Sequence, residues 1–291
     1  NAFDTKTVVR GVERVLALDE KTGNTLWKHE YPSDYRISYA AGPRCTPSVD
    51  GDRVYTLGAM GDLFCLSTAD GSVKWAKQFM KEYGANVPVW GFSSHPLVDG
   101  DKLICLVGGS DGRLVMAFDK LTGKELWKAL SYEAGDFGYS PPVIYDLAGR
   151  RTLVIWHPKA LVGLDPESGK ELWSVPFTSK AALTAPMPRP VGADGVFVTS
   201  FYNGSMLVKA TATGADAVWR SKAKGETPNL TTDLSSIMPT PFVRDGYVYG
   251  VDSYGQLRCV EAATGKRVWA TMQATRGRYT PEKVREREEP S

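Results

Sequence analysis

The sequence predicts an all-β fold, a β-propeller of four-stranded antiparallel blades, and two observations lead to this prediction. The first is a string of the form AxDxxTGxxxW, copies of which end at tryptophans 46 to 52 residues apart. The second is a block that precedes most copies: a proline, an apolar pair, an Asp-Gly turn and an alternating apolar run. Alternation bounded by turn residues is typical of half-buried strands, and a period of this length is typical of propeller blades.

The tryptophan that ends each copy is predicted to be structural. Clear copies are LALDEKTGNTLW, AFDKLTGKELW, GLDPESGKELW and CVEAATGKRVW, and looser ones stand elsewhere. A flat indole can wedge between neighbouring sheets while its N–H reaches a backbone carbonyl, as in a tryptophan-docking motif. The repeat tryptophans are Trp27, Trp75, Trp127, Trp173, Trp219 and Trp269.

A glycine precedes each of these tryptophans, in the turn between the third and fourth strands of a blade. A tight turn there needs a positive φ, which glycine adopts without steric cost. We therefore expect a left-handed conformation at Gly23, Gly71, Gly123, Gly169, Gly214 and Gly265.

Counting strands places the propeller over residues 1–273, and residues 274–291 are predicted to be a charged, disordered tail. The last two strands of one blade span 12–31, and five full blades start near residues 43, 92, 139, 184 and 237. About six blades are thus visible. Because an exposed strand edge on the first blade is an aggregation hazard, we favour a truncated ring over a six-blade ring with an imperfect seam. The resemblance of these repeats to a known family implies a ring of up to eight blades. Missing blades or a partner chain would close it.

Composition excludes several classes of protein. The formal net charge is only +2, which does not favour nucleic acid as a partner. The sequence has no run of about 18 apolar residues, so it predicts no membrane-spanning helix. The chain starts at Asn1 and shows no signal peptide. Cys45, Cys65, Cys105 and Cys259 form no CxxC pair, so we expect buried thiols and predict no metal site.

Strand order divides the connections between two faces of the propeller. The Asp-Gly and Thr-Gly turns share one face, whereas the loops between strands two and three and between blades share the other, which we call the top face. Its irregular residues make it the candidate functional surface, because binding residues concentrate on loops. The ligand-binding candidates there are Arg44, Trp90, His95, Tyr139, Trp156, His157, Lys159, Tyr202 and Tyr254.

Aromatic and basic side chains at the mouth of the central channel suit a ligand with a flat or anionic part. His95 and Asp136 are the candidate catalytic pair, as a general base pair or as two metal ligands. Packing roles for His95, His157, Trp90 and Trp156 stay open. The sequence contains no GxSxG elbow, HExxH motif or phosphate loop.

The AxDxxTGxxxW repeats resemble those of the quinoprotein-like, or PQQ-repeat, β-propeller family, over roughly residues 12 to 273. This family includes pyrroloquinoline-quinone-dependent alcohol dehydrogenases and the lipoprotein of the outer-membrane β-barrel assembly machinery. Stretches such as VPVWGF, HPLVDGDKLICLVGG and SFYNGSML are similar to single-propeller repeat proteins of planctomycete-type bacteria. The dehydrogenases' adjacent cysteines, calcium-binding Glu/Asn/Asp set and catalytic Asp have no recognisable counterparts here. The resemblance therefore implies the fold, and no cofactor is predicted.

We predict a non-catalytic binding or assembly module, with a protein or small-molecule ligand on the top face. The resemblance implies the periplasm or cell envelope as its location. One alternative is a truncated or divergent PQQ-dependent alcohol or sugar dehydrogenase, in which PQQ, with calcium, places its carboxylates near Arg44 and Lys159. Another is a hydrolase with a metal or His/Asp site at the mouth of the central channel.

Overall fold

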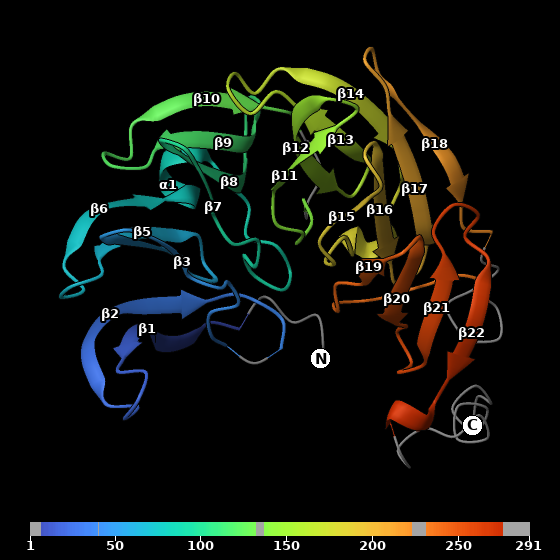
Figure 1. The fold of residues 1–291 in the computed structure, drawn as a ribbon. Helices are drawn as coiled ribbons and strands as arrows, with labels where there is room; N and C mark the ends of the chain where they lie inside the picture. Colours follow the sequence, from blue (N-terminus) through green and yellow to red (C-terminus); the bar gives the residue numbers. More distant parts are fainter. Residues whose placement is uncertain (1–6, 40, 132–136, 223–230, 276–291) are drawn as a thin grey trace. The chain divides into compact units, whose positions relative to one another are not determined.

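The computed structural model describes residues 7–39, 41–131, 137–222 and 231–275, and nearly every regular element in them is a strand (Figure 1). The strands form five four-stranded sheets and one two-stranded sheet. In each four-stranded sheet, strands that follow one another in sequence are antiparallel neighbours. The predicted blade of four consecutive antiparallel strands is confirmed.

Two compact units divide the chain, and the first comprises residues 1–142 together with the turn at 167–170. Its two-stranded sheet covers the segment predicted to hold two strands, residues 12–31. The strands are β1 (Val9–Leu18) and β2 (Thr25–Tyr35); β3 (Ser48–Asp50), β4 (Arg53–Leu57), β5 (Asp62–Ser67) and β6 (Val73–Gln78); and β7 (Leu97–Asp99), β8 (Lys102–Gly109), β9 (Arg113–Asp119) and β10 (Glu125–Ala129). A short helix, α1 (Phe79–Tyr83), follows β6.

The second unit comprises residues 143–166 and 171–291 and holds three complete blades. Their strands are β11 (Val143–Leu147), β12 (Arg150–His157), β13 (Ala160–Leu164) and β14 (Glu171–Pro176); β15 (Arg189–Val191), β16 (Gly195–Ser200), β17 (Gly204–Ala210) and β18 (Ala215–Arg220); and β19 (Phe242–Arg244), β20 (Tyr247–Val251), β21 (Leu257–Glu261) and β22 (Arg267–Thr271). Two 3-10 turns, η1 (Lys180–Ala182) and η2 (Gln273–Thr275), complete it.

The core lies between the faces of successive blades. The middle strands β8, β13 and β16 are buried almost throughout, and their sequences are accordingly near-continuous apolar runs. In the second unit, one cluster joins Val154 and Trp156 of β12 to Val198 of β16 and Met206 of β17. A second cluster joins Phe197 of β16 to Val248 of β20 and Val260 of β21.

Four of the repeat tryptophans contact the Gly-containing turn of the next blade, whereas the Trp173 ring lies over Gly163 of its own blade. The indole N–H of Trp27 donates to the Thr68 carbonyl at 2.7 Å, and that of Trp219 donates to the Ala262 carbonyl at 2.8 Å. A Cβ atom on Gly71 would lie 2.5 Å from the Trp27 ring, so only glycine fits beneath it. The same ring-to-glycine contact joins Trp75 to Gly123, Trp127 to Gly169 and Trp219 to Gly265.

The prediction of a positive φ fails at one of the turn glycines. Gly23, Gly71, Gly123, Gly169 and Gly265 have φ between 71° and 73°, but Gly214 is not left-handed. We number the blades with β1–β2 as the first, so β15–β18 form the fifth. The fifth blade closes this hairpin with a shorter turn, in which the Thr211 N–H donates to the Gly214 carbonyl at 2.8 Å. The Gly214 N–H in turn donates to the Thr211 hydroxyl at 3.1 Å, which removes the need for a left-handed residue.

Candidate functional site

Several of the predicted ligand-binding residues of the first unit lie together, in the segments that lead into β3, β7 and β11. The rings of Trp90 and Tyr139 have their centroids 5.5 Å apart. The half-buried Arg44 side chain donates to the Gly42 carbonyl at 2.6 Å, and Tyr139 lies within its electrostatic range. Burial lowers the pKa of the Arg44 guanidinium. Because Tyr139 is only 6% exposed, this cluster offers Trp90 and Arg44 to a ligand more than it offers the tyrosine.

The proposed catalytic pair is placed only in part. His95 is half-buried, and burial lowers the pKa of its imidazole, which favours the neutral form. Asp136 lies outside the described residues. Within the described ranges, no group of three or more His, Cys, Asp or Glu side chains is placed to hold a metal ion. The four cysteines are all unpaired.

In the second unit, Tyr202 and Tyr254 lie on neighbouring loops and share an aromatic neighbour that sequence reasoning missed. Phe201 contacts Tyr202 at 4.4 Å between ring centroids and lies 6.3 Å from Tyr254. The Lys180 ammonium lies 4.5 Å from the centre of the Tyr202 ring, and the backbone N–H of Lys180 donates to the Asn203 side-chain oxygen at 2.9 Å. We call these five residues the aromatic surface.

Loop geometry explains the aromatic surface. Tyr202 and Asn203 form the turn between β16 and β17, and the Asp252 carboxylate accepts from the backbone N–H groups of Tyr254 and Gln256, which fixes the turn between β20 and β21. Phe201, Tyr202, Asn203 and Tyr254 are half-buried and Lys180 is exposed. A positioned cation beside partly exposed rings is a typical arrangement for recognition of a partner surface.

The other candidates of this unit lie deeper. Trp156 is 1% exposed and packs against Phe177 in the core, with ring centroids 5.7 Å apart. His157 is 8% exposed, and burial, together with the nearby Lys159 charge, lowers the pKa of its imidazole to about 4. Strand β12 continues through His157, so the turn that follows exposes Lys159 and leaves both rings inside.

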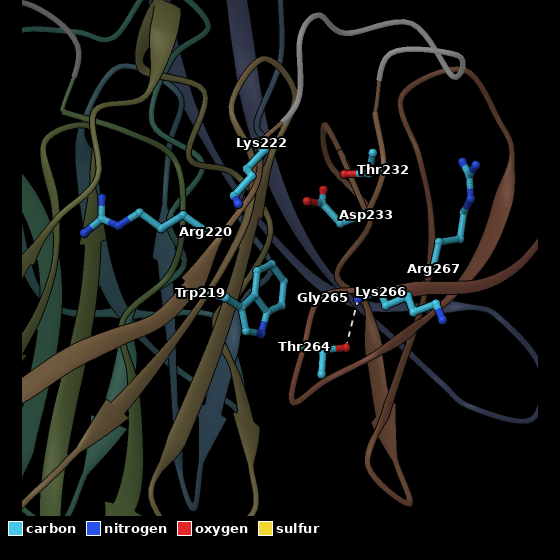
Figure 2. A pocket seen from close by; sticks show the side chains of 9 residues that line it. All are labelled: Trp219, Arg220, Lys222, Thr232, Asp233, Thr264, Gly265, Lys266 and Arg267. Atoms are coloured by element: carbon cyan, nitrogen blue, oxygen red, sulfur yellow. Dashed lines mark hydrogen bonds between the residues drawn. The ribbon is translucent and has the colours of Figure 1, made fainter.

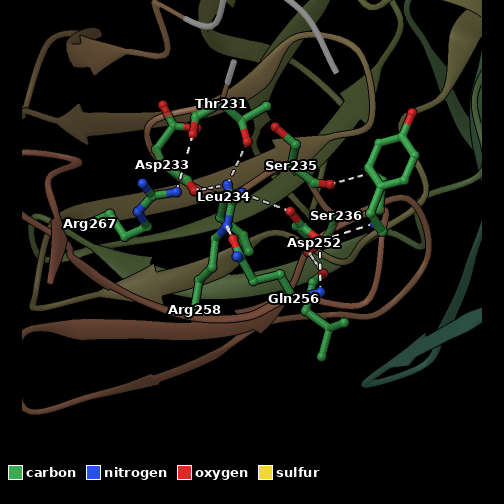
Figure 3. A network of polar contacts seen from close by, with 12 residues as sticks. Thr231, Asp233, Leu234, Ser235, Ser236, Asp252, Gln256, Arg258 and Arg267 are labelled. Atoms are coloured by element: carbon green, nitrogen blue, oxygen red, sulfur yellow. Dashed lines mark hydrogen bonds and ion pairs between the residues drawn. The ribbon is translucent and has the colours of Figure 1, made fainter. Parts of the chain in front are cut away.

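A groove that the sequence did not predict lies beside the last two blades of the second unit, with a volume of 480 Å³ (Figure 2). It is lined by the end of β18, by Thr232 and Asp233, and by the turn between β21 and β22. A buried polar network lies next to it (Figure 3). There, the fully buried Arg258 guanidinium forms an ion pair with Asp252 at 2.8 Å and donates to the Thr231 hydroxyl and the Asp233 carbonyl, both at 2.6 Å.

Comparison with known proteins places this geometry in a family. The family model described as outer membrane protein assembly factor BamB matches residues 11–271. The chain belongs to this family. The crystal structure of BamB from Moraxella catarrhalis superposes with a TM-score of 0.62 at 21% identity, over 89% of this chain and 70% of that one. The fold is therefore that of a PQQ-repeat β-propeller, as the repeats predicted.

Two curated relatives of this BamB-family chain match by sequence. BamB of Moranella endobia is 25% identical over 234 residues, which cover 77% of this chain and 56% of that protein. The serine/threonine-protein kinase AfsK of Streptomyces griseus is 27% identical over 172 residues, covering 57% of this chain and 20% of the kinase. The chain thus spans about half of the first relative's length and about a fifth of the second's. Among the described residues, no helix is long and apolar enough to span a bilayer.

Proposed function

We propose that this chain is a non-catalytic binding module of the cell envelope, which holds a protein partner through the aromatic surface. The observation that carries the proposal is the cluster of Phe201, Tyr202 and Tyr254 beside Lys180, on loops positioned by two rigid blades. Tyrosine and phenylalanine are enriched in the buried centres of protein interfaces, and a ring fixed by its neighbours loses little conformational freedom on binding.

Family membership supports the same proposal. The family's description and one of the relatives name an outer membrane protein assembly factor, whose work is the assembly of other proteins. The same kinship supports a location in the periplasm or envelope and a protein as the partner. The tryptophan and glycine contacts between blades suit a rigid support for loops, with the chemistry of recognition left to the turns.

Site-specific photo-crosslinking tests this function. A photoreactive phenylalanine analogue placed at Tyr202 is expected to capture a discrete protein from envelope extracts, and Tyr254→Ala in the same chain is expected to reduce that product. The matched control is the analogue at Tyr247, which is 37% exposed and lies at the opposite end of β20 from Tyr254. Equal products from both positions, or none from Tyr202, would contradict the proposal.

The quinone alternative has its own measurement. The protein's melting temperature is compared with and without PQQ plus calcium, because a ligand that binds the native state raises it by mass action. The binding-module proposal expects no rise, and a clear rise that Arg44→Gln or Lys159→Gln removes would favour the dehydrogenase.

A further inference from the structure

Four basic side chains line the groove of the second unit, and the described residues around them do not neutralise their charge. Arg220, Lys222, Lys266 and Arg267 all line it, and all are exposed. Among the described residues, none of them forms an ion pair, whereas Lys102 and Lys120 elsewhere in the chain pair with carboxylates at 2.8 and 2.5 Å. Unpaired cations around one concave surface favour an anionic ligand.

Comparison between repeats shows that this charge is not a requirement of blade packing. The turn before the repeat tryptophan reads TGKE in the third blade and SGKE in the fourth, but TGKR in the last. Arg267 thus stands where Glu125 and Glu171 stand in the other copies, while Lys266 matches Lys124 and Lys170. The last blade therefore has a second cation beside this lysine, where the third and fourth blades have a glutamate.

The floor of the groove is fixed from beneath. Arg258 lies in β21, one residue before the position that pairs with the repeat tryptophan. The corresponding residues of the second and third blades are Phe64 and Met116. In place of an apolar side chain, its guanidinium binds Thr231 and Asp233 from inside, and Arg267 donates to the Thr231 carbonyl at 3.4 Å (Figure 3). The segment that lines the groove is therefore held in one position.

An acceptor faces the same space. The Asp233 side chain, which is 2% exposed, points toward Lys222 (Figure 2), and burial raises the pKa of its carboxyl to about 6. Burial disfavours the charged form of this carboxyl, so it offsets the four exposed cations only in part.

The arrangement of the cations decides between anionic ligands. Figure 2 shows the Arg220 and Arg267 side chains pointing to opposite sides of the groove, with Lys222 between them. A single phosphate cannot contact groups that diverge in this way, whereas an extended segment with several carboxylates can.

We propose that this groove binds an acidic peptide segment of a partner protein, with carboxylates on the four cations. The proposal rests on the proposed function as a binding module and adds a second contact with the partner. It concerns a charged groove, in contrast to the aromatic surface, so each site can be tested alone.

The probe is a short fluorescein-labelled peptide of alternating Glu and Asp residues, with binding followed by fluorescence anisotropy. Arg267→Glu introduces the residue that the third and fourth blades have at this position. We expect it and Lys222→Glu each to weaken binding by about fivefold or more, as expected when one close charge contact is reversed. Lys266→Glu is expected to do the same, and its matched control is Lys124→Glu at the same repeat position. Binding is also expected to weaken between about 0.05 and 0.3 M salt.

Three results would overturn the proposal. If Lys124→Glu weakened binding as much as Lys266→Glu, the attraction would be unspecific. If the corresponding Gln and Asn peptide bound as tightly as the acidic peptide, the groove would not select for negative charge. Displacement of the peptide by inorganic phosphate at equal concentration would show a simple anion site. Tyr202→Ala is expected to leave peptide binding unchanged, so loss of the groove and loss of the aromatic surface are separate outcomes.

Discussion

Replacement of Arg258 by methionine tests whether this buried arginine of the last blade is energetically coupled to its carboxylate partner, Asp252. The Arg258 and Asp252 side chains are 0% and 1% exposed, and their charged atoms lie 2.8 Å apart. Removing the guanidinium leaves a buried carboxylate without its counter-ion, which typically costs about 3 to 5 kcal/mol. Methionine is the residue at the same position of the third blade, so the cost is not one of side-chain size.

The second step of this experiment removes the charge on the partner. Asp252→Asn keeps the oxygen that accepts from the Tyr254 and Gln256 N–H groups, and it has no charge to leave uncompensated. The double variant is therefore expected to be more stable than Arg258→Met alone by about 2 kcal/mol, within the range of coupling between contacting residues.

Urea unfolding followed by tryptophan fluorescence measures all four members of this cycle. The reasoning is refuted if Arg258→Met costs less than about 1 kcal/mol, or if the two substitutions are additive. Either result would mean that the Arg258 pair is solvated or readily rearranged, and that the adjoining groove lacks a fixed floor.

Three further changes test the blade contacts and the buried histidine. Trp27→Phe loses the indole donor to the Thr68 carbonyl and is expected to cost about 1 to 3 kcal/mol by urea unfolding, whereas Trp269→Phe, at a ring 42% exposed, is expected to cost under about 1 kcal/mol. Gly71→Ala places a Cβ 2.5 Å from the Trp27 ring at φ 71° and is expected to lower the melting temperature, so an unchanged value would contradict the contact. The pKa of His157 is lowered to about 4 from an ordinary 6.5, so the unfolded state binds the proton first and stability is lost as pH falls through this interval. His157→Gln is expected to flatten that part of the stability-pH profile, and identical profiles would argue against the buried neutral imidazole.

The repeat made the blades predictable, whereas the site depended on details that the repeat does not encode. Strand order and number follow from the alternating runs, because each run is bounded by turn residues that end one strand and begin the next. Gly214 broke the rule since its hairpin is closed by a shorter turn. Trp156 was expected near the surface, but β12 extends to His157 and carries the ring inward.

The unforeseen parts of the site come from residues far apart in sequence. Phe201 lies next to the predicted Tyr202, and that proximity was the signal available for it. Arg258 lies in an ordinary-looking strand, LRCVE, and nothing in that string indicates that Thr231 and Asp252 would surround its guanidinium. Aligning the repeats with one another offers a better signal for such residues, because an arginine at a position that is apolar in the other repeats can be recognised without a structure.

The contact between a tryptophan and the glycine turn of the following blade also bears on how such chains evolve. The two halves of the contact, as in Trp27 with Gly71 and Trp75 with Gly123, recur at four junctions between successive repeats. A tandem duplication of one repeat would therefore bring a ready-made junction on each side, without any compensating substitution. Gene rearrangement can then alter the number of blades while loop residues such as Tyr202 diversify independently.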